Sequence, residues 1–142
     1  MKKFLGITIL LIVVISLCLT SCAGKNEEKG SLWDNAIYKE DVSLGNGSKT
    51  VEVEVKAEEK SVTITLETNK KTLGDALMEH KLVSGEKSAY GLYIKFVNGM
   101  EADYDKTKTY WAFTKDGEGM LHGVDSEKIA DGSHYELECI KE

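Results

Sequence analysis

Hydrophobic and polar residues alternate along two neighbouring segments of the chain. Residues 51–56 alternate valine with glutamate and lysine, and residues 62–67 alternate valine, isoleucine and leucine with threonine and glutamate. A period of two places successive side chains on opposite faces of a strand. Residues 57–60 between the two segments are mostly polar and suit a turn. The pattern therefore predicts a β-hairpin with one buried face.

A helical spacing follows the hairpin. Leu73, Ala76 and Leu77 recur at intervals of three and four residues, and an aspartate stands three residues after Thr72. This spacing lines one face of a helix, and a threonine followed by an acidic residue in that position resembles a capping box. We predict one short helix over residues 73–80.

Three further strands are predicted, over residues 93–97, 109–114 and 134–140. Asn98-Gly99 follows the first strand and favours a tight hairpin, and Asp116-Gly117 marks another turn. A hairpin, one helix and further strands are typical of an α+β domain. We expect residues 50–142 to form a single β-grasp-like domain, in which the crossing helix covers one face of a mixed sheet.

The first residues have the pattern of an export signal. Lys2 and Lys3 precede the apolar residues 4–19, and the run ends at Leu19-Thr20-Ser21-Cys22. A charged start, an apolar run and small residues are the parts of a secretory signal peptide, and the run is a little short for a membrane-spanning helix. The Leu-x-Ser-Cys arrangement resembles a bacterial lipobox, which implies cleavage before Cys22 and lipid on its thiol. The alternative is an uncleaved anchor helix.

On this interpretation residues 1–21 are a lipoprotein signal peptide, and lipid on Cys22 anchors the protein to the outer face of the cell membrane. Stable anchoring needs at least two acyl chains, which the lipoprotein modification supplies. Residues 22–49 are rich in lysine, glutamate, glycine, asparagine and serine. We expect them to form a flexible tether, with its second half laid against the domain.

Charge and cysteine content narrow the function classes. The chain has 18 basic and 24 acidic residues, and removal of residues 1–21 takes two lysines and no acid, which leaves 16 minus 24, or −8. Nucleic-acid binding is disfavoured because it depends on clustered basic residues. With Cys18 in the signal peptide and Cys22 lipidated, Cys139 has no intramolecular partner. We expect Cys139 to be a buried strand residue rather than a reactive thiol.

Several segments of the chain together resemble a known family. They are Val97-Asn98-Gly99-Met100, Lys108-Thr109-Tyr110-Trp111-Ala112-Phe113, Gly123-Val124 and Ile129-Ala130-Asp131-Gly132, with Val62 to Leu66 and Thr72 to Leu77 upstream. In order and spacing they resemble the C-terminal domain of the animal cobalamin carriers, intrinsic factor and transcobalamin. They resemble more closely the bacterial DUF4430-like domains of unknown function.

This resemblance spans about residues 51 to 140 and implies a β-grasp-like domain. In the animal carriers the domain closes over a cobalamin that is held mainly by a helical barrel. The sequence contains nothing that could form that barrel. The resemblance therefore makes cobalamin a candidate ligand, without implying a fixed cofactor.

Neighbouring aromatic residues supply the candidate ligand site. Tyr110 and Trp111 are adjacent in a predicted strand, so their side chains point to opposite faces. Trp111 and Phe113 make the heavier apolar face, which leaves Tyr110 outward, where it can meet a planar ligand. The alternative is that all three aromatic residues belong to the core or cover the sheet. We take Tyr110, Trp111 and His122 as ligand-binding candidates, near residues 117–123.

Signals for metal binding and catalysis are weak. The three histidines are far apart, and none has a second ligand at helical or hairpin spacing. Glu101, Asp103 and Asp105 alternate but lack the glycine and final glutamate of an EF-hand, so we interpret them as a solvated acidic edge and assign no metal ligand. No nucleophile and base occur in a recognisable catalytic order, so we do not expect an enzyme.

Export, anchor and resemblance together favour a membrane-anchored binding module outside the cytoplasm. We expect it to capture a small ligand such as cobalamin or a related planar molecule, alone or with a partner protein or transporter. One alternative is an adhesion or assembly module that binds a protein or a cell-wall polymer. A second alternative is metal capture, which would require the acids after Gly99 to converge with a histidine.

Overall fold

The computed structural model describes residues 30–142. The expected signal peptide, the lipidation at Cys22 and the first part of the expected tether lie outside the described residues. Within residues 30–142, no helix has the length and apolar character needed to cross a membrane.

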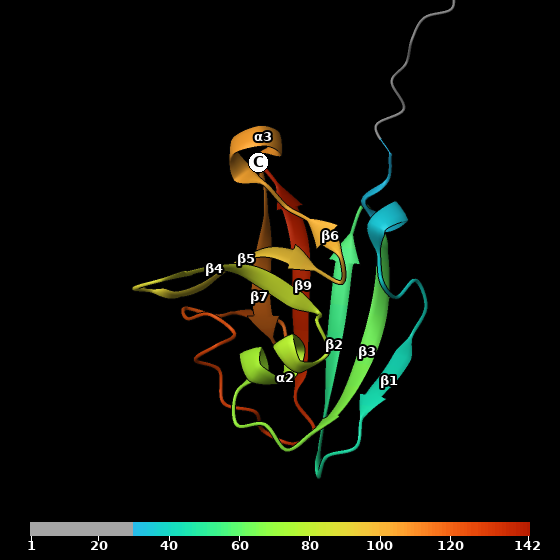
Figure 1. The fold of residues 1–142 in the computed structure, drawn as a ribbon, viewed down its shortest axis with the longest axis vertical. Coiled ribbons are helices and arrows are strands. Elements are labelled where there is room, and N and C mark those ends of the chain that lie inside the picture. Colours follow the sequence, from blue (N-terminus) through green and yellow to red (C-terminus); the bar gives the residue numbers. More distant parts are fainter. Residues whose placement is uncertain (1–29) are drawn as a thin grey trace, which may run out of the picture.

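Six strands form the larger sheet (Figure 1). They are β1 (Val42–Gly45), β2 (Lys49–Ala57), β3 (Lys60–Thr68), β7 (Thr109–Lys115), β8 (Glu118–Gly119) and β9 (His134–Lys141). Their order across the sheet is β1-β3-β2-β9-β7-β8. β1 and β3 are parallel, β2 and β9 are parallel, and the other neighbours are antiparallel. The sheet is therefore mixed, as the sequence predicts.

A second layer covers one face of this sheet. It contains α2 (Leu73–Glu79) and a smaller sheet of β4 (Val83–Ser88), β5 (Gly91–Val97) and β6 (Met100–Glu101). The short helix α3 (Tyr104–Thr107) connects β6 to β7, and the 3₁₀ helix η1 (Leu32–Asn35) precedes β1. The predicted α+β class is confirmed, but the strands form two sheets. β5 pairs with β4 along its length and with β6 at Phe96 and Val97, so it belongs to the smaller sheet and not to the larger one.

The locally encoded elements form as predicted. β2 and β3 make the hairpin, with Val53 opposite Ile64 and both side chains fully buried. Thr72 is the N-cap of α2, and its hydroxyl accepts a hydrogen bond from the Asp75 backbone N–H at 3.2 Å. Such a cap satisfies a backbone donor that has no partner within the helix. The predicted helix is one residue too long, because His80 is its C-cap.

The Asn98-Gly99 turn has a second role besides joining β5 to β6. Both residues have positive φ, as the tight hairpin turn requires. The buried Asn98 side chain also exchanges two hydrogen bonds with the backbone of Tyr38, at 2.9 and 2.7 Å. Trp33 is buried as well, and its Nε1 donates to the Ala57 carbonyl at 2.8 Å. Residues 30–49, which were expected to belong to the tether, thus contribute η1 and β1 and pack against the domain.

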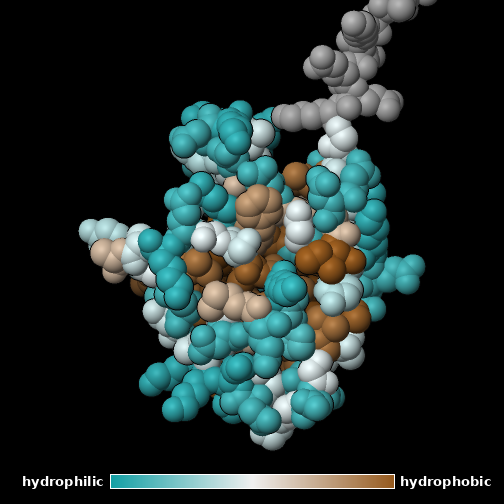
Figure 2. Space-filling model, viewed as in Figure 1, coloured by the Kyte–Doolittle hydropathy of each residue, from teal (hydrophilic) through white to brown (hydrophobic). Residues whose placement is uncertain are grey.

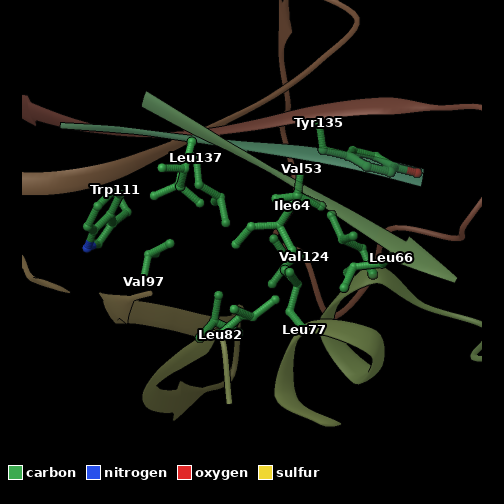
Figure 3. Close-up of a cluster of buried hydrophobic side chains, with 14 of the residues drawn as sticks. Val53, Ile64, Leu66, Leu77, Leu82, Val97, Trp111, Val124, Tyr135 and Leu137 are labelled. Atoms are coloured by element: carbon green, nitrogen blue, oxygen red, sulfur yellow. The ribbon is translucent and has the colours of Figure 1, made fainter. Parts of the chain in front are cut away.

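The core lies between the two layers (Figure 3). Val53, Ile64 and Leu137 project from the larger sheet toward Leu77 of α2 and Val97 of β5, and all five are at most 1% exposed. On the covered side of the molecule, hydrophobic side chains gather at the middle and hydrophilic ones surround them (Figure 2). One face of the larger sheet is therefore committed to packing, and strand alternation turns its remaining side chains to the opposite face.

Candidate metal centre on the outer sheet face

The outer face of the larger sheet carries charged side chains at its centre. Val51, Val53 and Val55 of β2 point into the core, so Glu52 and Glu54 of the same strand must point outward. The same alternation applies to β9, where buried Tyr135 and Leu137 leave His134 and Glu136 on the outer face. These outward positions meet because β2 and β9 are paired neighbours.

The register brings two carboxylates directly opposite each other. Glu54 faces Glu136 across the β2–β9 pair, and Glu52 faces His134. Like charges in directly opposite positions destabilise a sheet. A positive charge close to both carboxylates would therefore stabilise this arrangement.

His134 completes a group of three potential metal ligands with Glu54 and Glu136. One ligand atom from each residue lies within 4.8 Å of the other two. His134 Nε2 is 3.5 Å from Glu54 Oε2 and 3.7 Å from Glu136 Oε1. The side chains are 34% exposed for the histidine and 22% for each glutamate, so the group is partly shielded but open to solvent.

These separations suit ligands of one ion. Zinc binds imidazole nitrogen and carboxylate oxygen at about 2.0–2.2 Å, which places two tetrahedral ligand atoms roughly 3.4 Å apart. Glu52 Oε2 lies 3.4 Å from His134 Nδ1, on the other side of the ring. A carboxylate in that position favours the tautomer with the proton on Nδ1, which leaves the Nε2 lone pair for a metal. The residues present thus supply both the ligands and the orienting partner of the histidine.

Lys56 supplies the positive charge near this group. Its Nζ is 3.0 Å from Glu136 Oε2 and 3.5 Å from Glu54 Oε2. The hydrogen bond with Glu136 raises the pKa of Lys56, and the same hydrogen bond lowers the pKa of Glu136. The ammonium therefore interacts with the same two carboxylates that a metal ion would use, so the lysine and the ion would compete for them.

The ligand-binding residues expected from the sequence lie apart. Trp111 is 8% exposed and belongs to the core, with Nε1 donating to the Lys95 carbonyl at 3.3 Å. Tyr110 is half-buried near the start of β7. His122 is hydrogen-bonded to Glu127. Glu127 also binds Lys115, which lies at the end of β7 away from Tyr110. The structure therefore does not bring Tyr110 and His122 into one site.

His122 instead belongs to a network around the buried Glu127. The Glu127 carboxylate accepts hydrogen bonds from Lys115 Nζ at 2.7 Å and from the buried Tyr135 hydroxyl at 3.2 Å, and lies 2.8 Å from His122 Nε2. Burial acts to raise the pKa of Glu127, but the bonds from Lys115 and His122 outweigh it and lower the pKa. This network joins the segment after β8 to β7 and β9.

The acids that follow Gly99 do not form the metal group. Asp103 is the N-cap of α3, accepting from the Lys106 N–H at 3.0 Å, and its carboxylate also pairs with Lys106 Nζ at 3.1 Å. Within residues 30–142, the group of acids and a histidine with metal-binding geometry is the one on β2 and β9. Sequence reasoning missed it, although the alternating charges at positions 52–56 and 134–138 were a visible signal.

Comparisons with known proteins match the chain to one family model and to solved structures. Residues 70–138 match the sequence model described as "Domain of unknown function (DUF4430)". A "putative metal binding protein" from Ruminococcus gnavus ATCC 29149, with a solved crystal structure, is 31% identical in sequence to this chain. The two structures match with a TM-score of 0.63, and the match covers 67% of this chain and 99% of that one. No curated protein matches the chain.

Haptocorrin, crystallised in complex with Cbi, is a more distant match. It is 21% identical with a TM-score of 0.49, and the match covers 69% of this chain. The chain corresponds to 26% of the haptocorrin chain.

Proposed function

The chain belongs to the DUF4430 family, and from that premise we propose that it is a lipid-anchored, extracytoplasmic β-grasp-like domain that binds a divalent transition-metal ion. The observation that carries the proposal is the convergence of Glu54, His134 and Glu136 on the outer face of the sheet. The R. gnavus relative, described as a "putative metal binding protein", supports the same class of ligand.

The donor set, which includes an imidazole, favours zinc over calcium and magnesium. Imidazole suits zinc and other transition metals, whereas sites for magnesium and calcium are built from oxygen ligands. The three protein ligands leave at least one coordination position for water or an external group. With lipid on Cys22, the ion would be captured at the membrane, where a partner protein or transporter could receive it.

Calorimetric titration of the full chain, purified in detergent, tests this proposal. Zn²⁺, Mn²⁺ and Ca²⁺ are titrated in parallel, and we expect saturable binding with Zn²⁺ tightest and Ca²⁺ weakest. His134→Gln and Glu136→Gln should each weaken Zn²⁺ binding about tenfold or more, because each removes one of three ligands.

Glu67→Gln is the matched control for Glu136→Gln. Glu67 is an outward-facing residue of β3. It is paired with Thr50 of β2, whereas Glu54 of β2 is paired with Thr63 of β3. Along β3, Glu67 is therefore four residues from the position opposite Glu54, or roughly 13 Å. The control changes the net charge equally and should leave Zn²⁺ affinity within about twofold. Equal losses in both variants would reduce the effect to general electrostatics and contradict the site.

Capture of cobalamin or another planar ligand stays a prediction. The residues on which it rests lie apart, with Trp111 in the core and His122 bound to Glu127. Cobalamin titrated into the same protein checks it directly. Saturable heat that is lost in Tyr110→Ala would place planar-ligand binding beside metal binding, and an absence of heat would leave the metal proposal unchanged.

A further inference from the structure

A hollow that is separate from the outer sheet face lies between β5 and α3. Its volume is about 390 Å³, which falls within the roughly 300–1,000 Å³ usual for small-molecule sites. Tyr93 and Tyr104 line it and are 46% and 40% exposed. Neither β2 nor β9, which carry the metal ligands, contributes to its lining.

The Tyr104 side chain makes two contacts before any ligand binds. Its hydroxyl donates to Glu142 Oε2 at 2.7 Å, and Lys108 Nζ lies 4.7 Å from the ring centroid. The hydrogen bond to Glu142 raises the pKa of Tyr104, so its phenol remains protonated at neutral pH. An aromatic side chain that already makes such contacts loses less conformational entropy when a ligand stacks on it.

The charged residues around the two tyrosines are largely paired with each other. Lys95 Nζ is 2.7 Å from Glu86 Oε1, and Lys106 Nζ is 3.1 Å from Asp103 Oδ2. The hollow therefore offers many hydrogen-bond donors and acceptors but little net charge. Such a lining favours an uncharged ligand with many hydroxyl groups over an ion or a strongly charged molecule.

We propose that Tyr93 and Tyr104 form a saccharide-binding site. A sugar ring presents an apolar C–H face that packs on an aromatic ring, and hydroxyl groups at its rim that bond to charged side chains. The hollow suits a short saccharide segment better than a large macrocycle. A free oligosaccharide and a sugar unit of a cell-wall polymer share this chemistry.

Saturation-transfer NMR and calorimetry on the full chain test the site, in a detergent without a sugar headgroup. Triacetylchitotriose and maltotriose represent free saccharides, and sedimentation with insoluble peptidoglycan represents the polymer. We expect saturable binding with transfer to the C–H protons of the sugar. Tyr93→Ala and Tyr104→Ala should each weaken it about fivefold, and Tyr104→Phe, which keeps the ring, should weaken it less.

Tyr90→Ala is the matched control, because Tyr90 is 98% exposed and does not line the hollow. It should bind like the parent chain, as should the parent chain in EDTA. Unchanged Zn²⁺ binding and circular dichroism in the tyrosine variants would show that they fold. Absence of binding to the oligosaccharides and to peptidoglycan, equal binding by the Tyr93→Ala and Tyr104→Ala variants, or loss of binding in EDTA would each overturn the proposal.

Discussion

Two clusters in this molecule each contain histidine, lysine and glutamate, but their positive and negative charges balance differently. In the first, one carboxylate, Glu127, interacts with Lys115, Tyr135 and His122, and its side chain is 7% exposed. In the second, Lys56 is shared between Glu54 and Glu136, beside His134. Histidine, lysine and glutamate occur in both, so composition alone does not separate them.

The difference between the clusters lies in how fully the negative charge is matched. Glu127 is buried, and buried charges persist in proteins when they are paired and hydrogen-bonded. The outer cluster contains three carboxylates when Glu52 is included and one lysine, so three negative charges against one positive leave −2 when His134 is left out of the count. A divalent cation would neutralise that excess. A balanced buried cluster therefore indicates a structural role, and an unbalanced, accessible one indicates a binding role.

Removal of Glu127 should have the largest effect on stability. Glu127→Ala leaves the Tyr135 hydroxyl buried without this acceptor and Lys115 without its counter-ion, so we expect the free energy of unfolding to fall by about 2–3 kcal/mol. Glu54→Ala, in the accessible cluster, should change it by about 0.5 kcal/mol or less. Urea unfolding of both variants checks the contrast, and similar losses would remove the distinction between the clusters.

Replacement of Lys56 should strengthen metal binding. The ammonium neutralises the two carboxylates that would ligate the ion, at 3.0 and 3.5 Å. Lys56→Gln removes this competing charge, and we expect Zn²⁺ affinity to rise about tenfold, after allowance for solvent screening. Lys60→Gln, at the exposed first residue of β3, gives the same charge change as a control. Weaker binding in Lys56→Gln would mean that the lysine supports the site instead of competing with the ion.

Acidification should reveal the contribution of the buried carboxylate. The pKa of Glu127 is lower in the folded protein than its ordinary value of 4.5, so the unfolded chain binds its proton more tightly. The stabilisation is fully present above pH 4.5 and is lost as the pH falls through the folded pKa. In Glu127→Gln the free energy of unfolding should therefore depend less steeply on pH below 4.5. Some slope should remain, because the pKa of Glu136 is lowered too.

Whether a feature could be predicted from the sequence depends on how close together its residues lie in the chain. The β2–β3 hairpin, the Thr72 cap and the Asn98-Gly99 turn depend on residues close together in the chain, and all three were predicted. β4 was missed because only Val83 of its six residues is buried, so it has no alternating pattern. The outer cluster was missed because its strands pair in parallel, with partners about 80 residues apart, as Lys56 and Glu136 are. Local patterns carry no information about that pairing.

The smallest expected effect on stability is that of replacing His122, and comparing it with the replacement of His134 distinguishes the two clusters. His122 is 44% exposed, and its contact with Glu127 is one of three, so Glu127 keeps Lys115 and Tyr135 when the imidazole is removed. We expect His122→Gln to lower the free energy of unfolding by about 0.5 kcal/mol and to leave Zn²⁺ affinity unchanged. His134→Gln should show the reverse, with unchanged stability and weakened Zn²⁺ binding. Two histidines, each beside glutamate, would then have separate roles because one carboxylate cluster is already neutralised and the other is not.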